Sequence, residues 1–246
     1  MDFEILFFVI AGFIAELIDG ALGMAYGVSL TTLLLGMGVP PSTASMSVHA
    51  SEIFTTIASG LSHLKLGNVD KRLFKRLVLP GVAGGVLGAY ILTSTPVEII
   101  KPVVTVYLLV MGLIILIKAF RKMEAKKTVK EAPALALIGG FLDAVGGGGW
   151  GPVVTSTLVA RGGNPRISIG SVNLAEFFVT VSEVATFIVF LGTVDVLIVV
   201  CLLIGGIIAA PLGAYVCRKI PAKTLMITVG TLITLLSIRN IYLSIG

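Results

Sequence analysis

Apolar runs of about 20 residues recur along the whole chain, and this pattern constrains the fold more than any other feature. A helix of ~20 apolar residues crosses the ~30 Å hydrocarbon core of a bilayer. The chain is 56% hydrophobic and 13% charged, whereas soluble domains carry about 25% charged residues. We therefore predict an all-helical integral membrane protein that crosses the cytoplasmic membrane several times and has the lipid bilayer as a partner.

The net charge of +5 does not indicate a nucleic-acid partner. The basic residues stand between the apolar runs, where they orient a chain in the membrane. Cys201 and Cys217 are isolated in apolar surroundings, which favours a packing role over a disulfide or a metal site. We predict no nucleic acid, no cofactor and no metal ion.

The second half of the sequence repeats the first at an offset of 124 residues. Identical residues fall on one another: Asp19 on Asp143, Gly23 on Gly147, Gly27 on Gly151, Ser47 on Ser171 and Glu52 on Glu176. Polar and glycine identities in register across a whole half indicate a duplication. We predict a first repeat over 1–121, a basic cytoplasmic linker over 122–132 and a second repeat over 133–246.

Each repeat contains four hydrophobic segments, and the opening one is interrupted. The segments cover 4–38, 42–64, 74–94 and 97–118, then 133–161, 167–190, 194–217 and 222–245. The first segment, about 35 residues long, would be ~52 Å as one helix, which is too long for a simple span. Glycine-rich stretches interrupt both opening segments, DGALGMAYG at 19–27 and DAVGGGGWG at 143–151. Because glycine destabilises a helix interior, we predict a break in each.

Two topologies fit these segments. If the opening segments span, the repeats are parallel; if they are re-entrant, each repeat has three crossings and the two are inverted. Basic residues prefer the cytoplasmic side. The inverted topology places 16 basic residues inside and only Lys101 and Arg239 outside, whereas the parallel one splits them 12 to 6. We predict two inverted repeats, each a glycine-broken re-entrant segment plus three transmembrane helices.

The two glycine breaks are the predicted substrate site. Interrupted segments at matching places in two halves mark the binding sites of transporters, and free backbone N–H groups at a helix start bind anions. Tyr26 and Trp150 stand beside the breaks, either as walls of the site or as packing residues. The predicted substrate-binding residues are Gly23, Tyr26, Gly27, Gly146, Gly147, Gly148, Gly149, Trp150, Ser47, Ser171 and Asn173.

A polar stripe follows the second segment of each repeat. Ser45, His49, Glu52 and Thr56 lie on one helix face, and the partner helix carries Asn173, Glu176, Thr180 and Glu183 in the matching register. Ionisable groups at membrane depth usually face an interior or a water-filled path. The predicted proton-coupling or gating residues are Glu52, Glu176, Asp19, Asp143 and His49. A structural role remains the alternative, with the glutamates bonded to broken helix ends and the aspartates capping them.

The chain resembles the sulfite exporter TauE/SafE family of membrane proteins. The resemblance rests on GFIAELIDGALGMAYG at 12–27 with GMGVPPSTAS at 36–45, and on GGFLDAVGGGGWGP at 139–152 with RGGNPRISIGSVNLAE at 161–176. The first half departs from its counterpart, which has glycine in place of Leu22, Met24 and Ala25 and Pro152 in place of Val28. The resemblance implies transport of sulfur-containing anions such as sulfite, sulfoacetate or thiosulfate.

We predict a secondary transporter that moves a small anion, a sulfur oxyanion such as sulfite, with proton coupling. The alternative is a proton- or cation-coupled carrier of another small solute, in which the carboxylates bind the cation. The sequence has no Gly-x-x-x-x-Gly-Lys-[Ser/Thr] phosphate loop for ATP hydrolysis and no nucleophile–base pair. We therefore predict that it is not an enzyme.

Overall fold

The computed structural model describes residues 2–65, 67–120, 131–161, 163–216 and 222–245, and every element in them is helical. The first half contains α1 (Asp2–Leu22), α2 (Tyr26–Gly36), α3 (Pro41–Lys65), α4 (Lys71–Ser94) and α5 (Val97–Phe120). The second half contains α6 (Ala132–Gly146), the π-helical turn η1 (Gly151–Thr155), α7 (Ser156–Ala160), α8 (Pro165–Leu191), α9 (Val196–Val216) and α10 (Ala222–Ile245).

The predicted segments correspond closely to these helices, and the all-helical fold class is confirmed. Each opening segment is broken in two, between α1 and α2 at residues 23–25 and between α6 and η1 at residues 147–149. The π-helical turn at 151–155 was not predicted. Most of the predicted linker at 122–132 lies outside the described residues, so the division into repeats stays a prediction.

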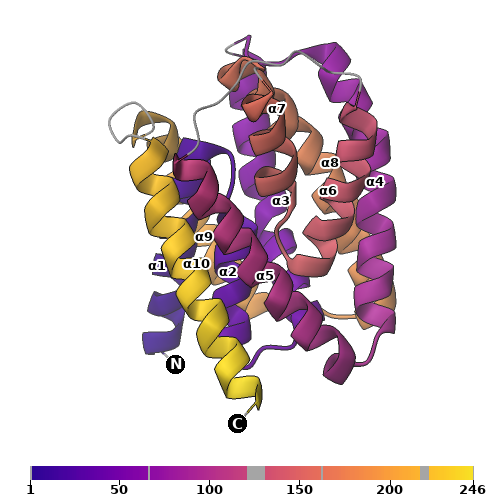
Figure 1. Ribbon diagram of the computed structural model, residues 1–246, viewed down its shortest axis with the longest axis vertical. Helices are drawn as coiled ribbons and strands as arrows, with labels where there is room; N and C mark the ends of the chain where they lie inside the picture. Colours follow the sequence, from indigo (N-terminus) through magenta and orange to yellow (C-terminus); the bar gives the residue numbers. More distant parts are fainter. Residues whose placement is uncertain (1, 66, 121–130, 162, 217–221, 246) are drawn as a thin grey trace.

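Helices from the two halves pair with one another. The closest pairs are α1 with α9, α4 with α6, α5 with α10, and α3 with α8. In Figure 1 both chain ends lie at the lower end of the molecule, and the end of α5 and the start of α6 lie at the upper end. Helix α6 descends from the upper end, and the chain returns upward through η1 and α7. The two broken segments therefore meet inside the helical bundle.

The outer faces of the described helices are apolar, and the interior combines an apolar core with several buried ionisable side chains. Large apolar residues such as Leu79 and Val189, each 76% exposed, cover the outer faces of the helices, while His49, Glu52 and Glu183 are buried. Such an extensive apolar surface is unfavourable in water and suits a lipid environment, where ionisable groups face the interior. Among the described residues, α4, α5 and residues 167–191 of α8 are long and apolar enough to cross a membrane. These properties define a membrane protein.

Glycines allow the paired helices to approach at backbone distance. A Cβ atom at Gly84 would overlap the carbonyl oxygen of Leu137, and one at Gly140 would overlap that of Gly81, where α4 crosses α6. The α1–α9 crossing uses Gly12 and Gly205 in the same way. Small residues at such crossings are typical of membrane helix packing.

We expect Gly140→Leu to destabilise the protein strongly, because the new side chain forces α6 away from α4. Overpacking of a core costs about 1–3 kcal/mol, and a backbone overlap costs at least that much. Ile138→Leu is the matched control, because Ile138 lies on the same helix and is 53% exposed. Melting in detergent, followed by size-exclusion chromatography, measures the difference. Equal melting temperatures for the two variants would contradict this packing model.

Candidate substrate site

Each break begins where a glycine ends a helix. Gly147 follows α6 with φ 63°, a left-handed conformation that ends helices and favours glycine, and its N–H group bonds to the carbonyl oxygen of Asp143. At the first break, the Gly23 N–H group donates to the carbonyl oxygen of Asp19 at 2.5 Å. The two breaks thus start with the same hydrogen bond at positions 124 residues apart.

The two aspartates also stabilise the start of the following helix. Asp143 Oδ1 accepts hydrogen bonds from the N–H groups of Gly149, at 2.6 Å, and Trp150, at 2.9 Å. Asp19 Oδ1 accepts one from the N–H group of Tyr26 at 3.2 Å. These contacts support the capping role for both aspartates, which the sequence left as an alternative. In each case an aspartate that precedes the turn accepts hydrogen bonds from the backbone that follows it.

The two breaks lie against each other. A Cβ atom at Gly27 would be 2.5 Å from the Cα atom of Gly148, and one at Gly151 would be 2.6 Å from the Cα atom of Met24. Thr31 Oγ1 adds a hydrogen bond of 2.7 Å to the carbonyl oxygen of Gly147. Because backbone meets backbone here, a side chain at either glycine would push the two halves apart.

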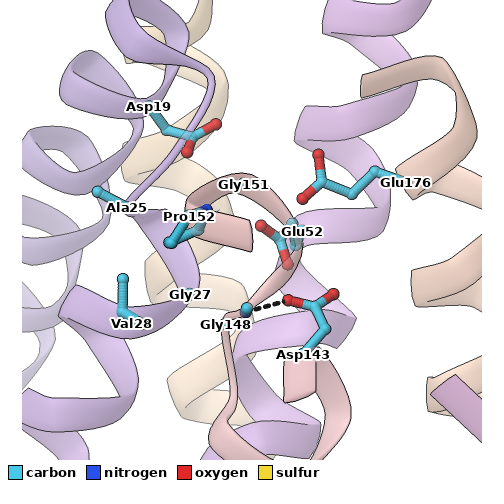
Figure 2. Close-up of a pocket in the computed structure, with 11 residues that line it drawn as sticks. Asp19, Ala25, Gly27, Val28, Glu52, Asp143, Gly148, Gly151, Pro152 and Glu176 are labelled. Atoms are coloured by element: carbon cyan, nitrogen blue, oxygen red, sulfur yellow. Dashed lines mark hydrogen bonds between the residues drawn. The ribbon is translucent and has the colours of Figure 1, made fainter. Parts of the chain in front are cut away.

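A small cavity lies where the breaks meet, with a volume of about 10 Å³, which is room for roughly one water molecule. It is lined by Asp19, Ala25, Gly27, Val28, Glu52, Asp143, Gly148, Gly149, Gly151, Pro152 and Glu176. In Figure 2 Glu176 extends from α8 toward Glu52 on α3, and both carboxylates lie at the cavity. A cavity of this volume cannot hold a multi-atom solute in this conformation.

The cavity lining contains four carboxylates and no basic side chain. It also contains backbone donors, because no hydrogen bond in the described part of the chain uses the N–H groups of Gly27, Val28 or Gly151. These N–H groups belong to the first turns of α2 and η1, which face each other across the cavity. The site therefore combines acids with two opposed helix starts that attract anions.

His49 lies directly behind the cavity in a buried polar cluster. Its Nδ1 atom is 3.0 Å from Glu52 Oε2, and its Nε2 atom is 3.3 Å from Glu183 Oε2 and 3.2 Å from the carbonyl oxygen of Asp143. Ligand atoms of His49, Asp143 and Glu183 lie within 4.8 Å of one another, a separation that would suit a metal ion. Both ring nitrogens of His49 have hydrogen-bond partners in Glu52 and the Asp143 carbonyl, whereas the carboxylate oxygens of Glu183 and Oδ2 of Asp143 have none among the described residues.

Lys118 connects α5 to the second break. Its Nζ atom lies 3.2 Å from the carbonyl oxygen of Pro152 and 2.5 Å from Ser156 Oγ. The π-helical turn directs the Ser156 N–H group to the carbonyl oxygen of Gly151, and the Pro152 carbonyl accepts hydrogen bonds from Lys118 and from the Ser156 hydroxyl instead. No ion pair of Lys118 occurs among the described residues. The Lys118 ammonium group is thus hydrogen-bonded to Pro152, a residue that lines the cavity.

Tyr26 and Trp150 pack away from the cavity, although they flank the breaks. Trp150 is fully buried against Gly81, and its Nε1 atom donates to the carbonyl oxygen of Val172 at 3.2 Å. The Tyr26 hydroxyl is 2.9 Å from Ser51 Oγ. The packing alternative that the sequence left open is the one these contacts support.

Several other predicted substrate-binding residues also lie outside the cavity lining. Ser171 Oγ accepts a hydrogen bond from the N–H group of Asp70 at 2.8 Å, which ties the start of α8 to the start of α4. Gly146 lies under the ring of Tyr107. Ser47 is fully buried, and Gly23 and Gly147 pack against the opposite break. Seven predicted residues line the cavity: Gly27, Gly148, Gly149, Asp19, Asp143, Glu52 and Glu176.

Four lining residues were absent from the predicted residues, namely Ala25, Val28, Gly151 and Pro152, as were Glu183 and Lys118 beside the cavity. Glu183 was noted in the polar stripe of α8 but not selected, although its spacing from Glu176 places both on one helix face. Pro152 lines the cavity and was noted only as a difference between the halves. Lys118 was assigned to the cytoplasmic positive charge, and no pattern in the sequence distinguishes it from the neighbouring lysines.

An apolar exterior that encloses a polar site at two broken helices defines a membrane transporter. Comparisons with known proteins agree. The model of the family described as sulfite exporter TauE/SafE matches residues 8–240. The chain is 43% identical over 248 residues to the probable membrane transporter protein YtnM of Bacillus subtilis (strain 168), an alignment that covers 97% of this chain and 83% of the relative.

A second relative is the probable membrane transporter protein YdhB of the same organism, at 26% identity over 88% of this chain and 89% of the relative. No solved structure matches. The chain belongs to the sulfite exporter TauE/SafE family. The resemblance seen in the glycine-rich motifs is thereby confirmed.

We expect Asp143→Ala to lower the free energy of unfolding by about 2–4 kcal/mol, because two buried N–H groups lose a charged acceptor. Asp143→Asn keeps the Oδ1 acceptor and should lower the free energy of unfolding by a smaller amount. Asp19→Ala is the control from the other half, and it should cost less than Asp143→Ala because one bond of 3.2 Å is lost. Chemical denaturation in mild detergent ranks the three variants. A larger loss for Asp19→Ala would refute the capping assignment.

Proposed function

We propose that this transporter moves a small anion, sulfite or a related sulfur-containing oxyanion, across the cytoplasmic membrane together with protons. The observation that supports this most is the pairing of unbonded N–H groups on two opposed helix starts with four carboxylates around one cavity. The family description names sulfite export, and a sulfur oxyanion is a compact acceptor suited to such backbone donors.

Protons are required by the charges in the cavity. An anion cannot approach four ionised carboxylates without strong repulsion, because like charges interact strongly where water is excluded. A protonated carboxyl group is neutral and donates a hydrogen bond. Glu52 and Glu176 come from different halves and point toward the same space (Figure 2). Protonation of these groups would turn a repulsive cavity into one that donates hydrogen bonds to the anion.

The two halves are proposed to be inverted repeats whose re-entrant hairpins, α1–α2 and α6–α7, alternately open the site to each side. Equivalent contacts support this: Gly27 lies on Gly148, and Gly151 lies on Met24, at positions related by the 124-residue offset. The same offset relates α1 to α6 and α4 to α9, so the α1–α9 pair is equivalent to the α6–α4 pair. The small volume of the cavity fits an occluded state between the two openings.

The second candidate is a cation-coupled carrier of another solute. The absence of a basic side chain in the described cavity lining favours it, because ionised carboxylates would bind a cation directly. The ion that drives uptake separates the two candidates. Sodium should drive transport in the cation-coupled carrier, and a proton gradient should drive it in the proposed one.

We expect reconstituted vesicles to exchange labelled sulfite, and we expect the KM of the wild-type protein to rise with pH. Glu176→Gln should flatten this dependence, because an amide resembles the protonated acid and cannot ionise. Glu98→Gln is the matched control, since Glu98 is exposed at the start of α5. Dividing the KM of Glu176→Gln by the KM of Glu98→Gln at each pH removes the effect of any change in the charge of sulfite itself. Failure of the wild-type protein to exchange sulfite would overturn the proposed substrate, and a pH dependence unchanged in Glu176→Gln would remove Glu176 from the site.

The inverted topology predicts which loops an impermeant thiol reagent reaches from outside intact cells. After Cys201 and Cys217 are replaced by serine, Asn164→Cys and Thr224→Cys should stay unlabelled, because both positions lie on the predicted cytoplasmic side. Thr193→Cys, in the loop between α8 and α9, should be labelled. Labelling after permeabilisation confirms that the first two thiols are reactive. External labelling of Asn164→Cys would instead favour parallel repeats.

A further inference from the structure

One polar pair in the core differs between the two halves in a way that packing does not explain. His49 on α3 and Glu183 on α8 approach to 3.3 Å between Nε2 and Oε2. The 124-residue offset converts His49 into Asn173 and Glu183 into Ser59. Asn173 Nδ2 donates to Ser59 Oγ at 2.9 Å across the same pair of helices. The same α3–α8 contact is therefore ionisable on one side and neutral on the other.

The Asn173–Ser59 pair shows what the packing of α3 on α8 requires. A neutral amide and a hydroxyl are enough to join these helices at one of two equivalent places. Burying an ionisable pair is much more costly than burying a neutral one, and His49 and Glu183 have no exposed surface. A costly pair at a position where a neutral one holds the same helices indicates a role in transport.

His49 is joined to the cavity by two groups that line it. Glu52 contacts its Nδ1 atom at 3.0 Å, and the backbone carbonyl of Asp143 lies 3.2 Å from its Nε2 atom. Its ring stacks on Phe187, and Glu183 fits against Gly85 of α4. Both carboxylate oxygens of Glu183 and Oδ2 of Asp143 are buried with no hydrogen-bond partner among the described groups. The charged or titratable groups around His49 are thus three acids: Glu52 on α3, Asp143 on α6 and Glu183 on α8.

We propose that the coupling proton is held by the His49–Glu183 pair and reaches it from the cavity through Glu52. This inference rests on the proposed function, because it assigns the proton that accompanies the anion. In the loaded state His49 is an imidazolium between the carboxylates of Glu52 and Glu183. In the unloaded state it is a neutral imidazole. One proton is taken from water on one face and released to water on the other, and no other bond is made or broken.

The charge arithmetic supports this assignment. Three acids and one histidine surround a single proton position, and an imidazolium there neutralises part of the negative charge beside the anion. An imidazole can bind and release a proton, whereas an amide and a hydroxyl do so only far outside the physiological pH range. The Asn173–Ser59 pair cannot exchange a proton in this range, so the transporter would carry its coupling proton on one side of the core only.

The test replaces the ionisable pair with its own neutral counterpart. The double variant His49→Asn, Glu183→Ser copies the Asn173–Ser59 pair into the equivalent place, so it is expected to fold. Purified protein is reconstituted into vesicles with the membrane potential clamped. The external pH is fixed and only the internal pH is varied. One coupled proton predicts about tenfold accumulation of labelled sulfite for each unit of pH gradient, and the double variant should lose this accumulation while it still exchanges sulfite at equal pH.

Two further proteins keep the outcome decisive. Glu183→Gln preserves shape, should also lose gradient-driven accumulation, and replaces the double variant if that variant does not fold. Ser59→Ala changes the neutral pair and should accumulate sulfite like the wild-type protein. Accumulation by the double variant or by Glu183→Gln at the wild-type level would overturn the proposal, as would wild-type uptake that responds to added Zn²⁺ or Mn²⁺ and not to the pH gradient. Absence of sulfite exchange in the wild-type protein would refute the proposed function instead, so the two failures are distinguishable.

Discussion

The contact between two backbone breaks is the constraint on which the rest of this structure depends. Non-helical backbone is tolerated at membrane depth only when its polar groups are satisfied within the protein. Asp143 accepts from Gly149 and Trp150, and Thr31 donates to the carbonyl oxygen of Gly147. Once the breaks lie against each other at Gly27 and Gly148, the helices that deliver them must pair across the two halves, as α1 does with α9 and α6 with α4.

This arrangement places groups with opposite preferences in one cavity. Helix starts attract anions, and carboxylates repel them unless protons are present. Such a site changes its affinity with its protonation state, which is the property that a proton-coupled anion carrier needs. The two halves supply equivalent acids at Glu52 and Glu176 but unequal neighbours, with His49 beside the first and Asn173 at the matching place beside the second. The two halves therefore differ at one ionisable pair, since His49 and Glu183 stand where the 124-residue offset gives Asn173 and Ser59.

Much of the fold follows from patterns that the sequence displays. The helices fall on the predicted segments, because the apolar runs are bounded by glycine, proline or charged residues and only the opening run of each half is too long for one span. The break positions were also predictable, since a run of four glycines cannot continue a helix. Seven predicted residues meet in the cavity, but Tyr26 and Trp150 do not. Their position beside the breaks was visible in the sequence, whereas the direction of their rings depends on distant helices: Gly81 leaves room for Trp150, and Ser51 bonds to the Tyr26 hydroxyl.

The sequence by itself determined that the protein is a helical membrane protein of duplicated sequence with two interrupted segments, because composition, period and glycine runs are local properties of the chain. The tertiary structure decided which polar residues share a site. Lys118 reaches Pro152, and His49 reaches Glu183, across separations that no local pattern encodes. Side chains on different helices meet only after the helices cross, and the crossing is set by backbone contacts between glycines far apart in the chain.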